Sequence, residues 1–582
     1  MKKLFFLASA LLCGAISASA VDYLVQTGKP GDAVWTDAAI STIKTNSPKV
    51  KVISFDTVKI ANLPTTGEFW FAAGTYDFTE SYDMKANTKL IGGFAGTETY
   101  ASAPKKQNNK PYDYVNPTIL NVVQPTGDKA TPIRLFKNDA QSGVVLTGLT
   151  IQNSKHTAGG GVYKVYSGNN IKYCTFKNNS TTNDGGAIIV FNQNATIEGC
   201  LFEGNKAANG GAIRIGGETI NLTATIKDCD FKNNEATNAS NGGGAISKVQ
   251  AIALNATGCT FDGNKAVYGG ALFVNSTKDV VVENCTFANN VATTNGGAFY
   301  LHASCSDTVT INACKMYLNT AVDGAAIYDG AAHYSVITNN AIYNNGCVVD
   351  ATKKYQAVVY IKPLLFANNT ICFNYGRVNV ASNVAKAVVA NNIVWGNKVQ
   401  TSSSTAEALA FTSASFNFVN ATETTGCTVS NNYTQNPITS SETGNKIVIS
   451  DNVKIVDSKT DFEAATDTFG VVPAERTDKY EKVLNANFAL TSGSQFINKG
   501  IDLELVTTDI LGTAREVGKC DVGAYEYVDK GPGTAIENTE KAPLDIQAAL
   551  QAGEVYNLLG QRVGELQAGN IYIVGGQKVL MR

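Results

Sequence analysis

The chain has 582 residues, of which 16% are charged, and it carries 53 glycines and a formal net charge of -2. A net charge this close to zero excludes the basic surface that nucleic acids or an anionic membrane would require. The low charged fraction is typical of a turn-rich β protein, and the length allows one large domain or several ordinary ones.

Residues 1–20 have the three parts of a signal peptide. Two lysines precede an apolar run, and residues 18–20 (Ala-Ser-Ala) supply the small side chains that signal peptidase requires. We therefore expect export, and a mature chain that begins at Val21 in the extracellular space or on the outer-membrane surface. Leu12 is too bulky for the position before a lipidated cysteine, so Cys13 does not indicate a lipoprotein. We expect no membrane-spanning segment after the signal peptide.

Residues 21–100 are predicted to form an N-terminal cap and the first coils of a β domain. The stretch 33–45 has apolar residues at helical spacing, so we expect a helix that covers the open end of the sheets: Trp35, Ala38, Ala39 and Ile43. The blocks FWFAAGTYDF (69–78) and LIGGFAGTE (90–98) follow. They are similar to the first coils of exported right-handed β-helix proteins of the Bacteroidetes, which implies that a right-handed β-helix starts here.

A repeat with two markers occupies the middle of the chain. Its first marker starts with a cysteine and recurs at steps of 26, 29, 30, 26 and 29 residues, at Cys174, Cys200, Cys229, Cys259, Cys285 and Cys314. Its second marker is Gly-Gly-Ala, at 185–187, 210–212, 243–245, 269–271 and 296–298, with Gly-Ala-Ala at 324–326. Around the markers apolar and polar residues alternate, as Cys259 and Phe261 and then Ala271 and Phe273 show.

Units of this size cannot bury an apolar face alone and must stack on their neighbours. The repeat therefore predicts an all-β fold, a single-stranded parallel β-helix with three short strands per turn, over residues 101–527. Its regular coils cover 174–327, and looser coils continue to about residue 435.

Each repeated residue type has a structural role in such a coil. The cysteines are expected to form an inward column, beside Phe176, Phe202, Phe231, Phe261, Phe287 and Met316. Parallel side chains hold Cβ atoms about 4.8 Å apart, beyond disulfide spacing, so we expect free thiols. Asparagines at left-handed corners are expected to bond from coil to coil, through Asn179, Asn205, Asn234, Asn264, Asn290, Asn319, Asn345, Asn374, Asn397 and Asn432. Gly-Gly marks a corner with positive φ or close backbone approach, and the alanine after it points inward.

Outward positions carry alternating charge in two columns, Lys177, Glu203, Lys232, Asp262 and Lys206, Glu235, Lys265. Opposite charges stacked in this way help to fix the register between coils. A ridge that binds a carbohydrate or a partner is the other interpretation.

The tetrapeptides FKNN, FEGN and FDGN alternate with GGAI and GGAL. They resemble the polymorphic outer-membrane protein repeat, whose signatures are FxxN and GGA followed by Ile, Leu or Val. The resemblance covers residue 174 to about residue 327 and implies an exposed, extended, adhesin-like protein.

Residues 493–527 are similar to the closing segment called choice-of-anchor Q, which implies that they end the β-helix. The residues on its motif are Asp509, Gly512, Arg515, Asp521, Gly523, Ala524, Tyr525 and Glu526. The linker 528–543 then leads to residues 544–582, which alternate like three strands with a turn at 575–576 and predict a small β-sandwich-like module. This module resembles the C-terminal sorting domain of type IX secretion substrates, which implies the type IX secretion machinery as a partner.

Few residues suggest catalysis. The three histidines, His156, His302 and His333, have no metal-ligand spacing, and outward Glu203 and Asp262 are separated by a lysine rather than paired for hydrolysis. Asp184 and Asp323 precede turn glycines and could bind calcium, although a turn aspartate is the ordinary explanation. We therefore predict no catalytic, cofactor or metal residues. If the chain were a lyase, the first residues to test would be Lys155, His156 and Lys164.

The sequence favours a secreted or cell-surface β-helix protein that acts in adhesion, by binding a glycan or a surface protein. A polysaccharide lyase or glycoside hydrolase of β-helix type is the alternative, and a structural surface protein is the third hypothesis. Aromatic side chains exposed along one face would favour binding, whereas an acidic cluster in a groove would favour an enzyme.

Overall fold

The structure is a computed structural model. It describes residues 21–99, 106, 110–127, 131–137, 141–166, 168–240, 242–330, 335–347, 357–380, 387–400 and 486–529, short segments between 411 and 483, and three strands between 555 and 580.

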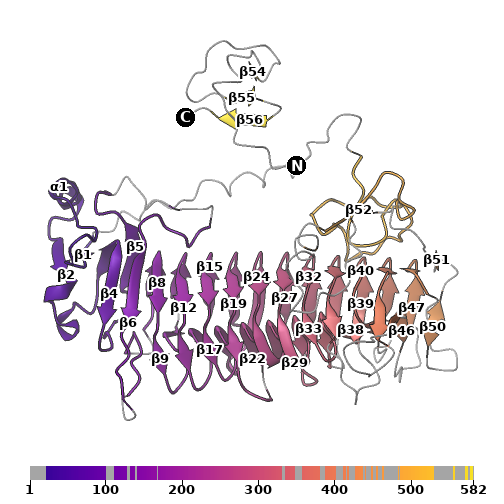
Figure 1. Cartoon of the computed structure of the whole chain (residues 1–582), viewed down its shortest axis with the longest axis horizontal. Helices are drawn as coiled ribbons and strands as arrows, with labels where there is room; N and C mark the ends of the chain where they lie inside the picture. The colour runs from indigo at the N-terminus through magenta and orange to yellow at the C-terminus, as the bar shows by residue number, and fades with distance from the viewer. Residues whose placement is uncertain are drawn as a thin grey trace. The chain divides into compact units, whose positions relative to one another are not determined.

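The described residues up to Tyr527 form one unit, in which short parallel strands wind into a coil (Figure 1). Three long parallel sheets follow the coil, named here sheets A, B and D. Sheet A has 16 strands, from β2 (Lys51–Ser54) to β50 (Ile447–Ile449), and sheet B has 14, from β4 (Gly74–Phe78) to β51 (Lys454–Ile455). Sheet D has 11 strands, from β10 (Tyr163–Val165) to β49 (Thr439–Ser440). The predicted all-β fold, a parallel β-helix, is confirmed.

The prediction of three strands per turn was too low for the regular coils. An eight-stranded parallel sheet, sheet C, runs from β9 (Lys155–His156) to β37 (Gly346–Cys347). The two residues after each ladder asparagine stay extended before the glycine corner, so they pair with the next coil. One coil consists of β11 (Asn170–Lys172), β12 (Thr175–Lys177), β13 (Ser180–Thr181) and β14 (Ile188–Phe191), and the next of β15 (Ala195–Glu198), β16 (Leu201–Glu203), β17 (Lys206–Ala207) and β18 (Ile213–Gly216).

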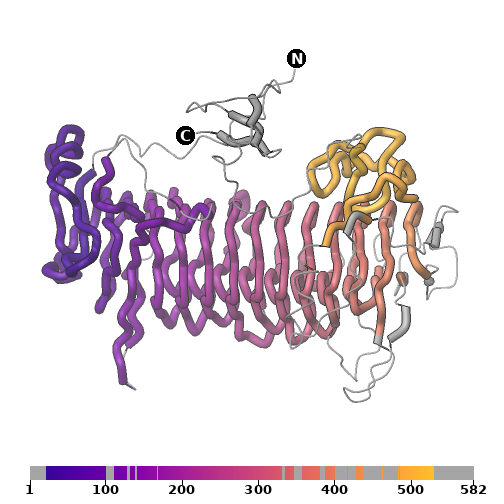
Figure 2. The backbone as a smooth tube through the Cα atoms, turned by 45° about the horizontal axis from the view of Figure 1, so that its top comes forward, coloured from indigo at the N-terminus to yellow at the C-terminus, as the bar shows by residue number. Residues whose placement is uncertain are grey.

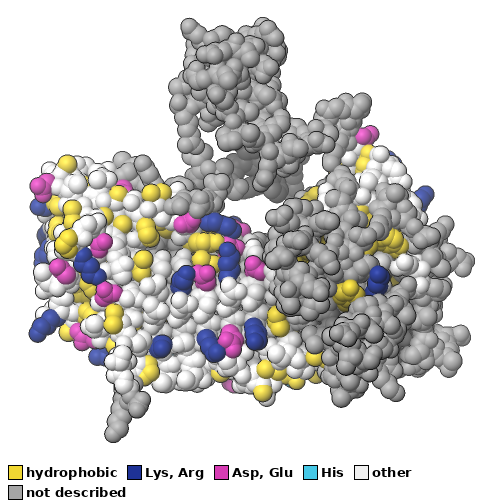
Figure 3. All heavy atoms as spheres, in the orientation of Figure 1, with side chains coloured by type: hydrophobic (Ala, Val, Ile, Leu, Met, Phe, Trp, Pro, Cys, Tyr) yellow, Lys and Arg dark blue, Asp and Glu magenta, His cyan; other side chains and the backbone are white. Residues whose placement is uncertain are grey.

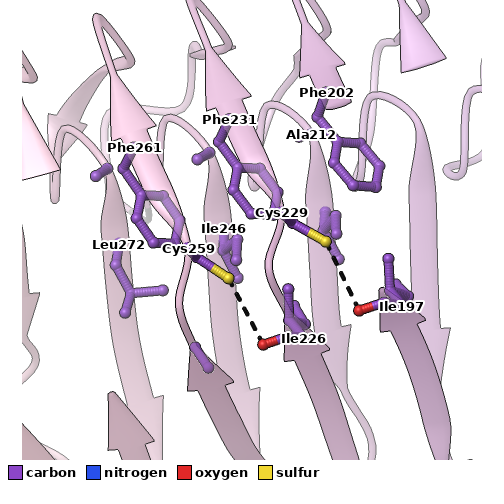
Figure 4. Packing of buried hydrophobic residues seen from close by; sticks show 14 of the residues in the cluster. Ile197, Phe202, Ala212, Ile226, Cys229, Phe231, Ile246, Cys259, Phe261 and Leu272 are labelled. Atoms are coloured by element: carbon purple, nitrogen blue, oxygen red, sulfur yellow. Dashed lines mark hydrogen bonds between the residues drawn. The ribbon is translucent and has the colours of Figure 1, made fainter. Parts of the chain in front are cut away.

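The predicted inward columns of phenylalanine and cysteine are confirmed. Phenylalanine rings from Phe176 to Phe287 stack with centroids 4.7–5.0 Å apart and planes within 3–7°. The cysteines beside them are buried and free. Their thiols donate to carbonyl oxygens of the preceding coil, as Cys229 does to Ile197 at 3.7 Å and Cys259 to Ile226 at 3.6 Å (Figure 4). Burial raises the pKa of the Cys229 and Cys259 thiols, which keeps these two groups protonated donors.

An asparagine ladder runs beside the phenylalanines from Asn179 to Asn397. From Asn205 onward, the side-chain oxygen of each member accepts two hydrogen bonds from the asparagine one coil earlier, one from the backbone N–H and one from the amide. For Asn264 and Asn234 these distances are 3.0 and 2.9 Å. The left-handed backbone lies one residue earlier than predicted, because the ladder residue must point inward and the residue before it makes the turn, as at Asn178 (φ 54°) and Asn233 (φ 54°).

The assignment of Asn432 to this ladder was wrong. Asn432 belongs to the cysteine column, where asparagines replace cysteine after Cys314 and bond from coil to coil: Asn340, Asn369, Asn392 and Asn432. The backbone N–H of Cys314 donates to the Asn340 side-chain oxygen at 2.9 Å. Both corners consist of a left-handed residue followed by an inward one, so the two columns have the same short sequence signature.

The glycine corner has the predicted geometry. Gly185 has φ +67°, and a Cβ on Gly186 would lie 2.0 Å from the carbonyl oxygen of Gly211 in the next coil. Ala187 follows and is fully buried. A side chain at Gly186 would therefore push these two coils apart.

The outward charges pair between coils as predicted. Lys177 lies 2.8 Å from Glu203, and Lys206 lies 2.9 Å from Glu235. Figure 3 shows lysine and acidic side chains alternating over the coils that contain β12, β16 and β24 (Thr260–Asp262). These pairs are half exposed, so each contributes less than about 1 kcal/mol and acts on register more than on stability.

The predicted N-terminal helix exists but covers a different surface. Helix α1 (Asp37–Asn46) begins after Thr36, whose side chain accepts from the Ala39 N–H. It buries Ala39 and Ile43 against Trp70 and Phe94, on the outer face of sheet A. The reason is the alternation in β3 (Glu68–Ala72), where Phe69 and Phe71 fill the core and Trp70 faces outward and needs cover. At this end Phe55 and Ile60, from two short 3-10 turns, η1 (Phe55–Thr57) and η2 (Ile60–Asn62), join the internal core instead.

The segment 493–527 lies along the corner between sheets A and B of the later coils (Figures 1 and 2). The left-handed corner asparagines bind it: Asn368 donates to the Asp521 carbonyl at 3.1 Å, Asn391 to Ile501 at 2.8 Å and Asn431 to Lys499 at 2.7 Å. Buried Arg515 donates to Asn339 and to the Gly523 carbonyl, both at 2.9 Å, and to Glu526. The motif residues of this segment therefore attach it to the side of four coils.

The second unit starts at Val528. Its described residues are three antiparallel strands in the order β54 (Val555–Asn557), β55 (Ile571–Val574) and β56 (Gln577–Leu580). Their role as a sorting module stays a prediction. The signal peptide, Cys13 and most of the linker 528–543 lie outside the described residues.

Candidate functional site

The three residues that the lyase hypothesis would test first lie on two different sheets. Lys155 and His156 lie on β9 of sheet C, where His156 Nδ1 is 3.0 Å from the Gly159 carbonyl oxygen. Lys164 lies on β10 of sheet D, with Nζ 4.9 Å from the ring centroid of Phe191. Fold geometry therefore gives these three residues different surroundings.

The two aspartates considered for calcium are engaged in turns. Asp184 accepts from Asn209 Nδ2 at 2.7 Å and lies 3.7 Å from the Arg214 guanidinium. Asp323 accepts from the N–H groups of Gly324 at 3.0 Å and Ala357 at 2.8 Å. Among the described residues no three His, Cys, Asp or Glu side chains are grouped to hold a metal ion. His333 lies outside the described residues.

Sheet D carries a column of aromatic side chains on its outer face. Phe273, Tyr300, Tyr328 and Tyr360 are paired in register across four consecutive strands, β26 (Leu272–Ser276), β30 (Phe299–Leu301), β34 (Ile327–Asp329) and β38 (Ala357–Ile361). Their neighbours on the same strands, such as Leu272 and Val274, fill the core. Successive ring centroids are 5.5, 5.5 and 5.1 Å apart, with planes within 7–16°.

Two further rings widen this column. Tyr268 lies 5.0 Å from Tyr300, and His302 lies 6.0 Å from Phe273. The tyrosines are half-buried, whereas Phe273 is covered completely. We name the set Tyr268, Phe273, Tyr300, His302, Tyr328 and Tyr360 the aromatic face.

Two phenol groups of the aromatic face, those of Tyr300 and Tyr328, are neutral at physiological pH. Burial raises the pKa of Tyr300 to about 12, and burial with nearby Asp323 raises that of Tyr328 further. A neutral phenol both donates and accepts a hydrogen bond. Because the rings stack on one another, each coil presents ring edges and one hydroxyl group to a ligand.

The sequence does contain a signal for this column, but the simple alternation of apolar and polar residues does not reveal it. Tyr300 and Tyr328 follow Ala298 and Ala326 by two residues, in GGAFY and GAAIY. We predicted that Phe273 shares the inward face of Ala271, and this was wrong. Ala271 and Leu272 are both inward because the chain leaves the glycine corner between them, so the alternation restarts and Phe273 faces outward.

Comparisons with known proteins agree with this architecture. Residues 126–287 match the family described as right handed beta helix region, and residues 284–301 match the Chlamydia polymorphic membrane protein repeat. The fold is therefore a right-handed parallel β-helix, and residues 284–301 are similar to one repeat of the polymorphic membrane protein type.

Other comparisons add little. No curated protein matches the chain. Among solved structures, a crystal structure of pectate lyase Pel9A is 13% identical over 88% of this chain and 98% of its own, with a TM-score of 0.28, which is too low to carry an argument. Among the described residues, no helix is long and apolar enough to cross a membrane.

Proposed function

We propose that this is an exported protein of the cell surface or extracellular space whose β-helix binds a glycan through the aromatic face. The signal-peptide pattern at residues 1–20 and the match to a membrane protein repeat support export and a surface location. The observation that carries the binding function is the register of Tyr300, Tyr328 and Tyr360, which repeats one half-buried phenol on each coil.

A linear glycan suits this arrangement better than a small ligand. The phenols recur at the coil spacing of about 4.8 Å, so a polymer laid along the coil axis meets an equivalent group at each coil. Sugars have apolar C–H faces and many hydroxyls, and a tyrosine edge offers both apolar contact and a hydrogen bond.

A glycan array tests the proposal, using the chain from Val21 to Arg582, with hits titrated in solution. Tyr328→Ala is expected to weaken binding about tenfold, the loss typical of a residue in the centre of an interface. Tyr317→Ala is the matched control, because Tyr317 stacks on Tyr343 at 5.3 Å and 18° but faces outward from sheet B. Failure to retain any glycan, or equal losses in the two variants, would overturn the proposal. New reducing ends or unsaturated products from a retained glycan would show an enzyme instead.

A further inference from the structure

A second surface feature lies on a different sheet. Residues 110–117, named here the strap, cross the outer side of sheet B. Lys110 Nζ lies 2.8 Å from Asp230 Oδ2, and the Tyr112 hydroxyl donates to the same oxygen. Burial acts to raise the pKa of Asp230, but the hydrogen bonds from Lys110 and Tyr112 hold it below its ordinary value. The strap is thus anchored to an ionised carboxylate on β20 (Asp230–Lys232), about 120 residues away in sequence.

Glycine corners beneath the strap make room for it. A Cβ at Gly148 would lie 3.1 Å from the Tyr114 ring, and a Cβ at Gly199 would lie 3.0 Å from Pro111. Both glycines have positive φ, +68° and +60°. Tyr114 is buried, and the chain then enters β6 (Thr118–Val122) in the body of sheet B. The strap is therefore a fixed wall of the molecule, held at both ends.

An open groove separates the strap from the strands below it. Its volume is about 490 Å³, within the range of pockets that take small molecules. The floor consists of outward residues in register on β8 (Leu149–Gln152), β12 and β16, namely Thr150, Thr175 and Leu201. The strap contributes Tyr112, Val115 and Pro117 to the wall.

The chemistry of the lining selects a class of ligand. Thr150 and Thr175 place two hydroxyls one coil apart, while Leu201, Val115 and the Tyr112 ring offer apolar surface. The positive charge of Lys110 is already neutralised by Asp230. Within the described residues the lining contains one carboxylate, Asp113, and no cation, so an anionic ligand is disfavoured.

We propose that this groove is a second binding site, which takes a neutral disaccharide or a disaccharide-length part of a longer neutral glycan. The apolar wall contacts the C–H face of a sugar ring, and the threonine hydroxyls bind sugar hydroxyls. The site rests on sheet B and does not depend on the aromatic face, which lies on sheet D with Tyr268 from the end of a sheet C strand.

The test is a titration of the full mature-length chain with cellobiose, maltose, lactose, N,N′-diacetylchitobiose and, as the anionic comparison, digalacturonate. Thr175→Trp fills the groove from its floor, and Val115→Trp fills it from its wall. Thr286→Trp is the matched control, because Thr286 occupies the same column of sheet B beyond the groove. Far-ultraviolet circular dichroism verifies that each variant is folded.

We expect at least one neutral disaccharide to bind, and both filling variants to weaken it at least about tenfold while Thr286→Trp does not. Tyr328→Ala should leave this affinity unchanged, so the groove and the aromatic face succeed or fail separately. The proposal is overturned by binding of none of the neutral disaccharides, by stronger binding of digalacturonate, or by equal effects of Thr175→Trp and Thr286→Trp.

Discussion

The asparagine ladder should carry more stability than the cysteine column in the same coil, and Asn264→Ala against Cys259→Ala tests this. The Asn264 oxygen accepts from the backbone N–H and the amide of Asn234 at 3.0 and 2.9 Å. Its own amide donates to the Phe231 carbonyl at 2.9 Å and to the Asn290 oxygen at 3.0 Å. Truncation to alanine removes all four bonds at a fully buried position.

The magnitude follows from the groups left without partners. Asn290 keeps a second donor, the backbone N–H of Asn264 at 3.0 Å, and the Asn234 amide keeps its bond to the Phe202 carbonyl at 2.9 Å. The Asn234 N–H and the Phe231 carbonyl each lose a partner. At about 1–3 kcal/mol for each of these two groups, Asn264→Ala should destabilise the coil by about 2–6 kcal/mol. Cys259 makes only long S–H contacts, 3.5 and 3.6 Å, so Cys259→Ala should cost about 1–2 kcal/mol, mainly from lost packing.

Hydrogen exchange measured by mass spectrometry reads this effect locally, which matters because a solenoid can open one coil at a time. Peptides that contain the Asn234 amide should exchange at least about a hundredfold faster in Asn264→Ala, and much less so in Cys259→Ala. The urea midpoint should fall in the same order. Equal acceleration in the two variants would refute the assignment of stability to the ladder.

Four further outcomes are expected. Cys314→Asn should keep or raise the urea midpoint, because an asparagine there would extend by one rung the ladder that begins at Asn340. Gly211→Ala should give unfolded or insoluble protein on expression, because its Cβ would lie 2.1 Å from a backbone oxygen of the next coil. Arg515→Met should release the segment 493–527, seen as faster proteolysis there but not in the regular coils, because Glu526 loses its buried partner. Burial lowers the pKa of Lys248 from 10.5 to about 7. Above pH 7 the unfolded chain therefore binds more protons at this lysine than the folded chain does. The free energy of unfolding rises with pH as a result, because the cost of burying a charged lysine disappears. The difference in unfolding free energy between Lys248→Met and the wild type should therefore shift by about 2 kcal/mol toward the wild type between pH 7 and 9, measured by urea unfolding at each pH.

The parts of the fold that could be predicted are those where one position tolerates few residue types. Phe202 recurs because its ring stacks on the ring of the neighbouring coil, and Asn205 recurs because a side chain without an amide would leave hydrogen-bonding groups of adjacent coils without partners. The period of the repeat follows directly from these inward positions. The period could not distinguish the two asparagine-containing columns, because the residues before Asn397 and Asn432 are similar although the two asparagines lie at different corners of the coil.

Two outward features, the aromatic face and the strap, were not predicted, each for a physical reason. The column from Phe273 to Tyr360 depends on which residue is the first to face outward on each strand. After a glycine corner the backbone geometry sets that position, and the residue types do not reveal it. The strap depends on a contact between Lys110 and Asp230, which are remote in sequence and carry no repeated signature. Sequence spacing reports neighbours along the chain and along a regular column, so both sites needed coordinates.

The two proposed sites lie on different sheets of one rigid coil, and this separation bears on how the protein would hold a surface. The groove spans β8 to β16 on sheet B, while the aromatic face spans β26 to β38 on sheet D, so the same glycan segment cannot occupy both. Two weak sites on one body raise retention on a glycan-rich surface far more than they raise affinity for a soluble fragment, because the second contact forms at a high effective concentration. The inward columns hold the coils together whatever the outward side chains are, so outward residues can form such sites without changing the fold. Loss of either site should therefore weaken attachment to a glycan-coated surface by a larger factor than it weakens binding of a soluble oligosaccharide.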